Sequence, residues 1–213
     1  MIQWRVKSTL FGTLMACAVL IFWPVAWGKE PNAITPQEGD IVFSCSEKGQ
    51  GEAIMAATGS PYTHCGVVFR QGGKWMVLEA VQPVGTVSLE DFLARGKAGT
   101  SRTLRLKAPL TPTALERGRV WASAQVGKDY DGKFLWSDSQ LYCSELVWKI
   151  YQHAGVELCK PRRFRDFRLE DPKVRKMIEH RYGDVNALPK DEKVVAPSDL
   201  AASPLLGEVA EQP

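Results

Sequence analysis

Two β-like segments joined by a glycine turn limit the possible folds of this chain more than any other feature. Thr63 to Arg70 and Trp75 to Val81 have the composition of strands, and Gln71-Gly72-Gly73-Lys74 between them is typical of a tight turn. We therefore predict an antiparallel hairpin. The turn fixes the register, and a slip of one residue would move every side chain to the other face.

The predicted register brings a histidine and a carboxylate together. With the turn centred on Gly72 and Gly73, Gly66 faces Glu79, and His64 and Glu79 become diagonal neighbours on one face, with Cα atoms ~7–8 Å apart. Cys65 points to the opposite face, so it is not the thiol that His64 would serve. The alternative is a core histidine with Glu79 as its buried counter-charge.

A second constrained stretch, Leu141 to Val147, opens a helix with an apolar stripe. Ser137 with Gln140, or Ser139 alone, is expected to cap this helix. The apolar stripe consists of Cys143, Val147, Ile150 and Ala154, and Gly155 is expected to end the helix.

Cys143 is a candidate nucleophile because of its place on this helix. Unpaired N–H groups and the positive end of the helix dipole favour a thiolate over a thiol. A base would have to come from elsewhere in the fold. The alternative is that Cys143 is a small buried hydrophobic residue.

The loop of residues 128–139 leads directly into this helix and is rich in aromatic residues. We expect Tyr130 and Trp136, together with Tyr142 beside the thiol, to line a substrate cleft. The alternative is that the loop aromatics cover the core.

Besides a short helix from Glu52 to Thr58 that Gly59 ends, helix signals occur at three further places. A cap residue or a proline opens each, and the predicted segments are Ser88–Arg95, Thr111–Val126 and Asp171–Tyr182. In the second of them we expect Val120 and Trp121 on the apolar face. Strands alternate with these helices, at residues 40–44 and 102–107.

Residues 1–28 have the pattern of an export signal. Arg5 and Lys7 form a short basic region, residues 10–27 are apolar, and Ala26-Trp27-Gly28 offers small residues for cleavage. We therefore predict an exported protein of the periplasm or cell envelope.

Two alternatives to a cleaved signal remain. Eighteen apolar residues could serve as an uncleaved anchor, which would associate the chain with a membrane through its N-terminus. A lipoprotein processed at Cys17 is the third possibility.

The rest of the chain, residues 29–213, is long enough for a single domain. Without residues 1–28 the 27 lysines and arginines fall by two to 25, against 24 aspartates and glutamates. So nearly neutral a chain does not favour a nucleic-acid partner.

Four cysteines remain after the signal: Cys45, Cys65, Cys143 and Cys159. An even number in an exported protein suggests two disulfides, but a catalytic Cys143 has to stay reduced. The cysteine spacings match no zinc pattern. We predict no metal site and no cofactor.

Several of these segments form a set when they are taken together. They are Gly39–Phe43, Ser60–Val68, Leu78–Val81 and Leu141–Val147. This set resembles the YiiX/YaeF-like branch of the NlpC-type cysteine hydrolases, the circularly permuted papain-like amidases, and the resemblance covers roughly residues 38–206.

The resemblance implies an α+β fold in which an antiparallel sheet packs against the helix that carries the catalytic cysteine. In ordinary papain-like enzymes that helix precedes the histidine strand. Here the order is His64, Glu79, Cys143, as the permuted family implies. By resemblance, Cys143 is the nucleophile, His64 the general base and then acid, and Glu79 the group that orients His64. The departure from the pattern is Cys65, where an apolar residue is expected.

Kinship with this family implies cleavage of amide bonds through a thioacyl intermediate. For an exported enzyme, cell-wall peptides are the natural substrates, and the expected partner is an amide-containing small molecule or peptide. One alternative is a lipid-directed thiol acyltransferase or esterase, since relatives of the lecithin:retinol acyltransferase type have a similar residue order. The other is a non-catalytic module that binds a small amine or peptide.

Overall fold

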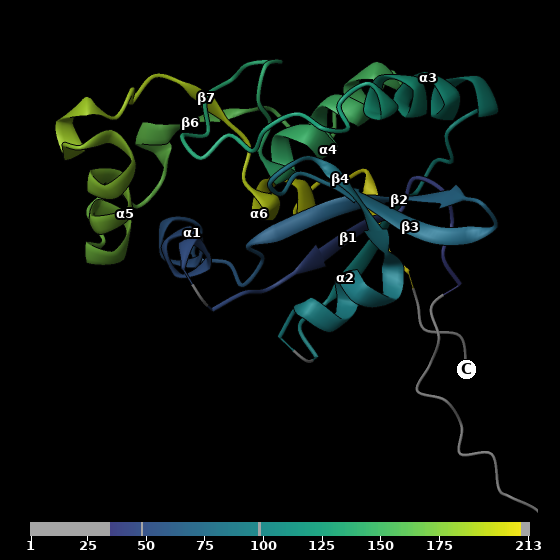
Figure 1. Cartoon of the computed structure of the whole chain (residues 1–213), viewed down its shortest axis with the longest axis horizontal. Helices are drawn as coiled ribbons and strands as arrows, with labels where there is room; N and C mark the ends of the chain where they lie inside the picture. The colour runs from purple at the N-terminus through teal and green to yellow at the C-terminus, as the bar shows by residue number, and fades with distance from the viewer. Residues whose placement is uncertain (1–34, 48, 98, 210–213) are drawn as a thin grey trace, which may run out of the picture. The chain divides into compact units, whose positions relative to one another are not determined.

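An antiparallel sheet lies at the centre of the fold (Figure 1). The computed structural model describes residues 35–47, 49–97 and 99–209, and within them the sheet has six strands in the order β4-β3-β2-β1-β5-β8. The strands are β1 (Ile41–Ser44), β2 (His64–Gln71), β3 (Lys74–Glu79), β4 (Gly85–Ser88), β5 (Arg102–Leu106) and β8 (Leu206–Glu208).

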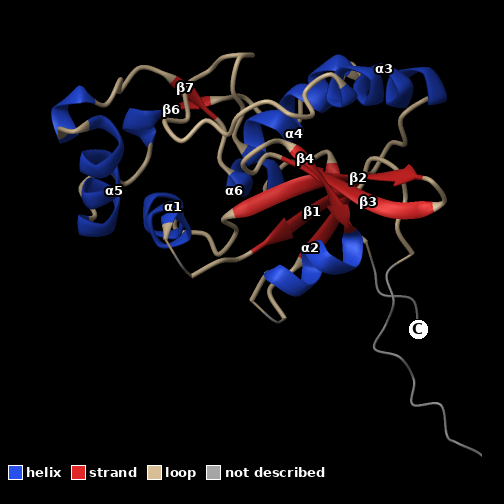
Figure 2. Cartoon of the chain, viewed as in Figure 1, coloured by secondary structure: helices blue, strands red, loops and turns tan. Residues whose placement is uncertain are grey.

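Helices cover the sheet and extend from one end of it (Figure 2). They are α1 (Gln50–Thr58), α2 (Leu89–Arg95), α3 (Pro112–Ser123), α4 (Cys143–His153), α5 (Pro172–Tyr182) and α6 (Pro197–Ala201). Two 3-10 helices and a small two-stranded sheet complete the described chain: Phe164–Asp166, Val185–Ala187, β6 (Arg162–Arg163) and β7 (Lys193–Val194). The predicted α+β fold is confirmed.

The predicted hairpin register is also confirmed. Gly66 pairs with Glu79, and Gln71 with Lys74. Gly72 and Gly73 have φ angles of 57° and 80°, the left-handed conformation that a two-residue hairpin turn needs and that glycine adopts without strain. The second strand ends at Glu79, two residues earlier than predicted.

The two faces of the sheet have separate apolar cores, and α2 and α4 lie on opposite faces (Figure 1). The α4 face includes Cys65 and Val67 of β2, packed against the predicted stripe of α4, whose four members are at most 4 % exposed. On the α2 face, Val68 and Val77 pack against Phe92. Side chains alternate along β2, so neighbouring residues pack against different helices.

The predicted cap of the cysteine helix is wrong. The helix begins at Cys143, its N-cap is Tyr142, and no side chain caps it. Backbone hydrogen bonds from Asp131 N–H to Leu141 C=O and from Leu141 N–H to Asp129 C=O keep the chain extended until just before the cysteine. The predicted cap residues Ser137, Ser139 and Gln140 therefore lie in the preceding loop.

The α3 helix differs from the prediction in length and orientation. It ends at Ser123, and Val120 is 61 % exposed rather than part of the core. The helix turns Gly118 towards α4, where an added Cβ would lie 3.1 Å from the Ile150 carbonyl oxygen. This close approach fixes which face is buried. Trp121 lies at the edge and stacks on His153 at 4.8 Å.

Within the residues that the structure describes, no helix has the length and apolar character needed to cross a bilayer. The predicted signal peptide or anchor, residues 1–28, lies outside the described residues.

Candidate active site

The hairpin joins His64 to Glu79, as the register predicts. Nε2 of His64 lies 2.6 Å from Oε2 of Glu79, whose side chain is 2 % exposed. Phe92 of α2 stacks on the imidazole, with ring centroids 5.6 Å apart and planes inclined by 25°. The imidazole is therefore held at one edge by the carboxylate and on one face by an aromatic ring.

The thiol of Cys143 reaches this imidazole from the other side of the sheet. His64 is the first residue of β2 and pairs with Ser44, the last residue of β1, so both strands end beside it. Cys143, the first residue of α4, lies close enough to His64, past these strand ends, to raise the pKa of the imidazole. Because Nε2 is bonded to Glu79, Nδ1 is the ring nitrogen left for the thiol.

Cys65 also contacts Cys143, and the sequence analysis missed this contact. Its side chain does point away from the His64 face, as predicted, but that places it on the α4 face. There its thiol and its backbone both interact with Cys143 and lower the pKa of that thiol, and Cys65 itself is fully buried. The four cysteines in the described residues are all free thiols.

Hydrogen bonding and charge favour an ion pair between thiol and imidazole. The hydrogen bond from Cys65 is the largest cause of the lowered pKa of Cys143; burial opposes it, and His64 adds to it. Burial alone would lower the pKa of His64, but Cys143 and Glu79 outweigh it and raise that pKa to about 9. The arrangement therefore favours Cys143 thiolate and His64 imidazolium over the neutral pair.

Glu79 stays ionised although it is buried. Burial raises its pKa, yet the hydrogen bonds from His64 and from Arg95 of α2 outweigh burial and lower it. Nη2 of Arg95 lies 2.5 Å from Oε1 of Glu79. Arg95 is a second residue that the sequence analysis missed. The signal that could have identified Arg95 is an ionisable residue at the end of the predicted helix 88–95, which follows the strand that carries Glu79.

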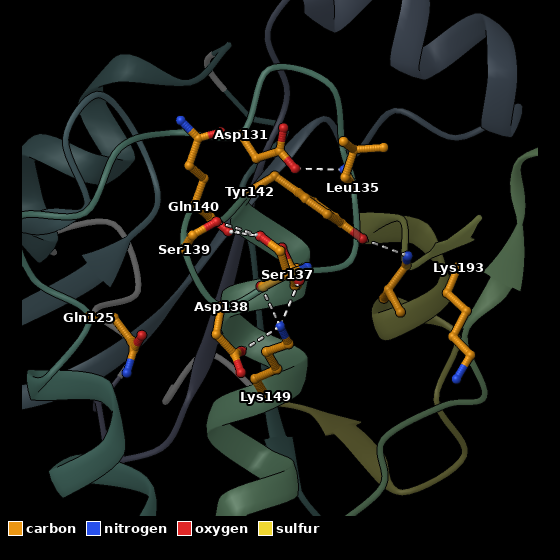
Figure 3. Close-up of polar contacts among 12 residues, drawn as sticks. Gln125, Asp131, Leu135, Ser137, Asp138, Ser139, Gln140, Tyr142, Lys149 and Lys193 are labelled. Atoms are coloured by element: carbon orange, nitrogen blue, oxygen red, sulfur yellow. Dashed lines mark hydrogen bonds and ion pairs between the residues drawn. The ribbon is translucent and has the colours of Figure 1, made fainter. Parts of the chain in front are cut away.

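The three aromatic residues that were predicted to bind substrate have different environments in the structure. The ring of Tyr142 lines a cavity beside Cys143, while its hydroxyl accepts the Val195 N–H at 3.2 Å (Figure 3). Tyr130 lies near the thiol and accepts a hydrogen bond from Gln50 at 3.0 Å. Trp136 packs edge-on against Trp148 of α4, at 5.1 Å, and does not line that cavity.

The cavity beside Cys143 has a volume of about 110 Å³ and almost entirely apolar walls. It lies between α1, α5 and the start of α4, and it includes Ala53, Ile54, Phe134, Val174, Ile178 and Val195. Phe134 has a φ of 56°, a left-handed conformation unusual for a bulky residue. Its ring meets Tyr142 edge-on at 5.2 Å, so the strained residue forms part of the cavity wall.

The fold and the chain order of these residues define a permuted papain-like protein, in which the histidine strand precedes the cysteine helix. The family model described as "Permuted papain-like amidase enzyme, YaeF/YiiX, C92 family" matches residues 35–210. The chain belongs to this family of cysteine-type amidases.

Two relatives support this assignment. The uncharacterized protein YiiX of Escherichia coli strain K12 is 36 % identical over 178 residues, covering 83 % of this chain and 87 % of the relative. A crystal structure titled "metalloprotein yiiX", from Escherichia coli O157:H7, matches with a TM-score of 0.77 and 36 % identity, covering 83 % of this chain and 98 % of that one.

Proposed function

We propose that this protein is a cysteine hydrolase that cleaves amide bonds through Cys143, His64 and Glu79. The observation that carries the proposal is that one imidazole joins the other two groups: Nε2 of His64 lies 2.6 Å from Glu79, and Cys143 is close enough to raise the pKa of the ring. A nucleophile, a base and a group that orients the base are the parts of a thiol hydrolase site. Membership of an amidase family supports amides as the bond type.

In the proposed mechanism the Cys143 thiolate attacks the acyl carbon of the substrate. The first helical hydrogen bond of α4 runs from Leu146 N–H to Tyr142 C=O, so the N–H groups of Cys143 and Ser144 are not used within the helix. They would hold the oxyanion. The His64 imidazolium gives its proton to the leaving amine, and the neutral imidazole then takes a proton from the water that releases the acyl group.

The apolar cavity favours substrates whose acyl part is apolar. It touches Cys143 directly, and its walls offer little to a polar peptide. This supports the lipid-directed alternative as a second candidate: hydrolysis or transfer of an acyl group through the same thioester. A cell-wall peptide would leave the cavity unfilled, whereas an acyl chain would bury apolar surface, at about 0.8 kcal/mol per buried CH₂.

A substrate panel tests both candidates. Purified protein should hydrolyse acyl amides with kcat/KM rising with chain length until the cavity is filled, and Ala53→Phe should lower that rate only for acyl groups that enter the cavity. Muropeptides and phospholipid esters complete the panel. Preference for muropeptides would contradict the role of the cavity. If the protein bound these compounds but turned over no amide or ester, the remaining interpretation would be the non-catalytic binding module.

The relative of known structure is described as a metalloprotein, which raises the question of a metal in this chain. Among the residues that the structure describes, no group of three or more histidine, cysteine, aspartate or glutamate side chains could hold a metal ion. At the candidate site, both oxygens of Glu79 are bonded, one to His64 and one to Arg95. These residues do not fit a metal centre, and the proposed mechanism has no step through one.

We also propose that the chain is exported to the cell envelope, either by a cleaved signal or with residues 1–28 as an anchor. The basic region and the apolar run support this. The mature chain should then begin near Lys29, and an intact mass that retained residues 1–28 would favour the anchor.

A further inference from the structure

Glu79 lies between two cationic partners that come from different elements. Its Oε2 faces His64 of β2 at 2.6 Å, and its Oε1 faces Arg95 of α2 at 2.5 Å. The Glu79 side chain is 2 % exposed, that of His64 20 % and that of Arg95 49 %. Arg95 therefore reaches from the protein surface to a buried carboxylate.

The number of charges in the site explains why such a cation is needed. With Cys143 as thiolate and Glu79 ionised, the site holds two buried anions, and His64 supplies a single positive charge. An unbalanced buried charge is costly, so without a further cation one of the anions would tend to take up a proton. Arg95 makes the number of positive and negative charges equal.

We propose that Arg95 is a positioning residue, whose guanidinium keeps Glu79 ionised and turned so that Glu79 holds the His64 imidazolium against Cys143. This inference rests on the proposed function. Arg95 acts through Glu79, because its hydrogen bond is to that carboxylate and not to the thiol or the imidazole.

The packing of α2 supports this role. The guanidinium lies over the ring of Phe92, 5.6 Å from its centroid, and the His64 imidazole also stacks on Phe92. Residues three apart on a helix share a face, so Phe92 and Arg95 reach the site together. The start of α2 is fixed because the Ser88 hydroxyl accepts the Asp91 N–H at 3.0 Å.

The other titratable groups around Glu79 do not duplicate Arg95. On β2, Cys65 interacts with the charge of Glu79 but is a thiol whose pKa burial raises. On α4, Cys143 faces His64 and would be negative itself. The strand paired with β3 beside Glu79 is β4, and Gly85–Ser88 carries no titratable side chain. On α2, Asp91 is bonded to Ser88.

The pH dependence of Cys143 alkylation by iodoacetamide tests the inference, with labelling of each cysteine measured by mass spectrometry at low ionic strength. In Arg95→Gln the acid limb of the rate profile should move to higher pH by about one unit, the lower end of the range for a carboxylate that loses an arginine. Arg95→Lys, which keeps the charge, should restore most of the shift.

Arg119→Gln is the matched control. Arg119 lies over the ring of Phe69 at 5.3 Å and pairs with Glu38, so like Arg95 it contacts an aromatic ring and a carboxylate, but neither partner belongs to the candidate site. It should leave the acid limb in place. In a Glu79→Gln background, Arg95→Gln should add no further shift, because the residue through which it acts is already neutral.

An unchanged acid limb in Arg95→Gln, an equal shift in Arg119→Gln, or a full further shift in the Glu79→Gln background would each overturn the inference. These outcomes differ from a failure of the proposed function. If His64→Ala slows labelling of Cys143 while Arg95→Gln does not change it, only the role of Arg95 is wrong. If His64→Ala has no effect, the proposed triad itself fails.

Discussion

Replacing Cys143 by alanine should abolish turnover of every substrate that the protein hydrolyses, with kcat reduced by at least about 10⁴-fold. The reason is that the neighbouring thiol among the described residues, Cys65, lies on the sheet face opposite to His64 and has no base of its own. The measurement is hydrolysis of the best acyl amide from the panel. The fold should persist, since the side chain is small and near the surface of the cavity.

The same prediction can be checked without knowing the substrate. In the wild-type protein, iodoacetamide should label Cys143 first at about pH 6, where an ordinary thiol with a pKa of ~8.5 is mostly protonated. His64→Ala should slow this labelling because the imidazolium is lost. The contribution of the ion pair to the reactivity of Cys143 should be lost as the pH rises through about 9, because His64 then loses its proton.

Two Cys65 variants separate its hydrogen bond from its volume. Cys65→Ser keeps a donor towards Cys143, whereas Cys65→Val does not. Labelling of Cys143 at about pH 6 should therefore be slower in Cys65→Val, by about tenfold for the loss of one hydrogen bond to a charged group. The ion pair itself would be contradicted if Cys45 or Cys159 were labelled before Cys143, or if His64→Ala did not change the labelling rate.

The second large effect concerns stability, at a buried ion pair that follows Cys143 along α4. Oε1 of Glu145 lies 2.8 Å from Nζ of Lys149, and these side chains are 0 % and 7 % exposed. Lys149 also donates to Ser137 C=O at 2.6 Å and to Asp138 at 2.8 Å, which ties the loop before Cys143 to the helix (Figure 3). Oε2 of Glu145 is buried with no hydrogen-bond partner among the described residues.

Lys149→Met should lower the free energy of unfolding by about 3–5 kcal/mol at pH 8, because it leaves a buried carboxylate without its cation. Burial raises the pKa of Glu145 to about 7, against the contributions of Lys149 and two backbone groups. At pH 5 Glu145 is therefore protonated, and the loss should be smaller. Urea unfolding at the two pH values measures the difference.

The sign of the pH effect in the wild-type protein follows from the same group. The pKa of Glu145 rises from its ordinary value of 4.5 to about 7 in the folded state, so the folded protein binds this proton more tightly. Its contribution to the free energy of unfolding is thus fully present below about pH 4.5 and is lost as the pH rises through about 7. Glu145→Gln should remove this component.

Two further variants control for the loss of lysine itself. Lys149→Met combined with Glu145→Gln should be more stable at pH 8 than Lys149→Met alone, because no unpaired charge remains. Lys97→Met removes an exposed pair with Glu47, whose side chains are 53 % and 56 % exposed, and should have little effect. Equal losses at pH 5 and pH 8 would show that Glu145 is not the titrating group.

The sequence by itself determined the local geometry. The glycine turn set the hairpin register, and with it the His64–Glu79 hydrogen bond, because side chains alternate along a strand and a turn length permits one pairing. Helical periodicity likewise placed Cys143 and Val147 on a buried stripe. Each of these results depends on residues close together in the chain.

Only the tertiary structure decided what surrounds the thiol. Local pattern did not show that α2 and α4 lie on opposite faces, so that Cys143 meets His64 past the strand ends and Cys65 turns towards Cys143. Nor did it show that Arg95 completes the charges around Glu79. The start of α4 was also misjudged, since bonds to residues 129 and 131 hold Leu141 extended. Contacts between distant segments depend on how whole elements pack, which no short window of sequence contains.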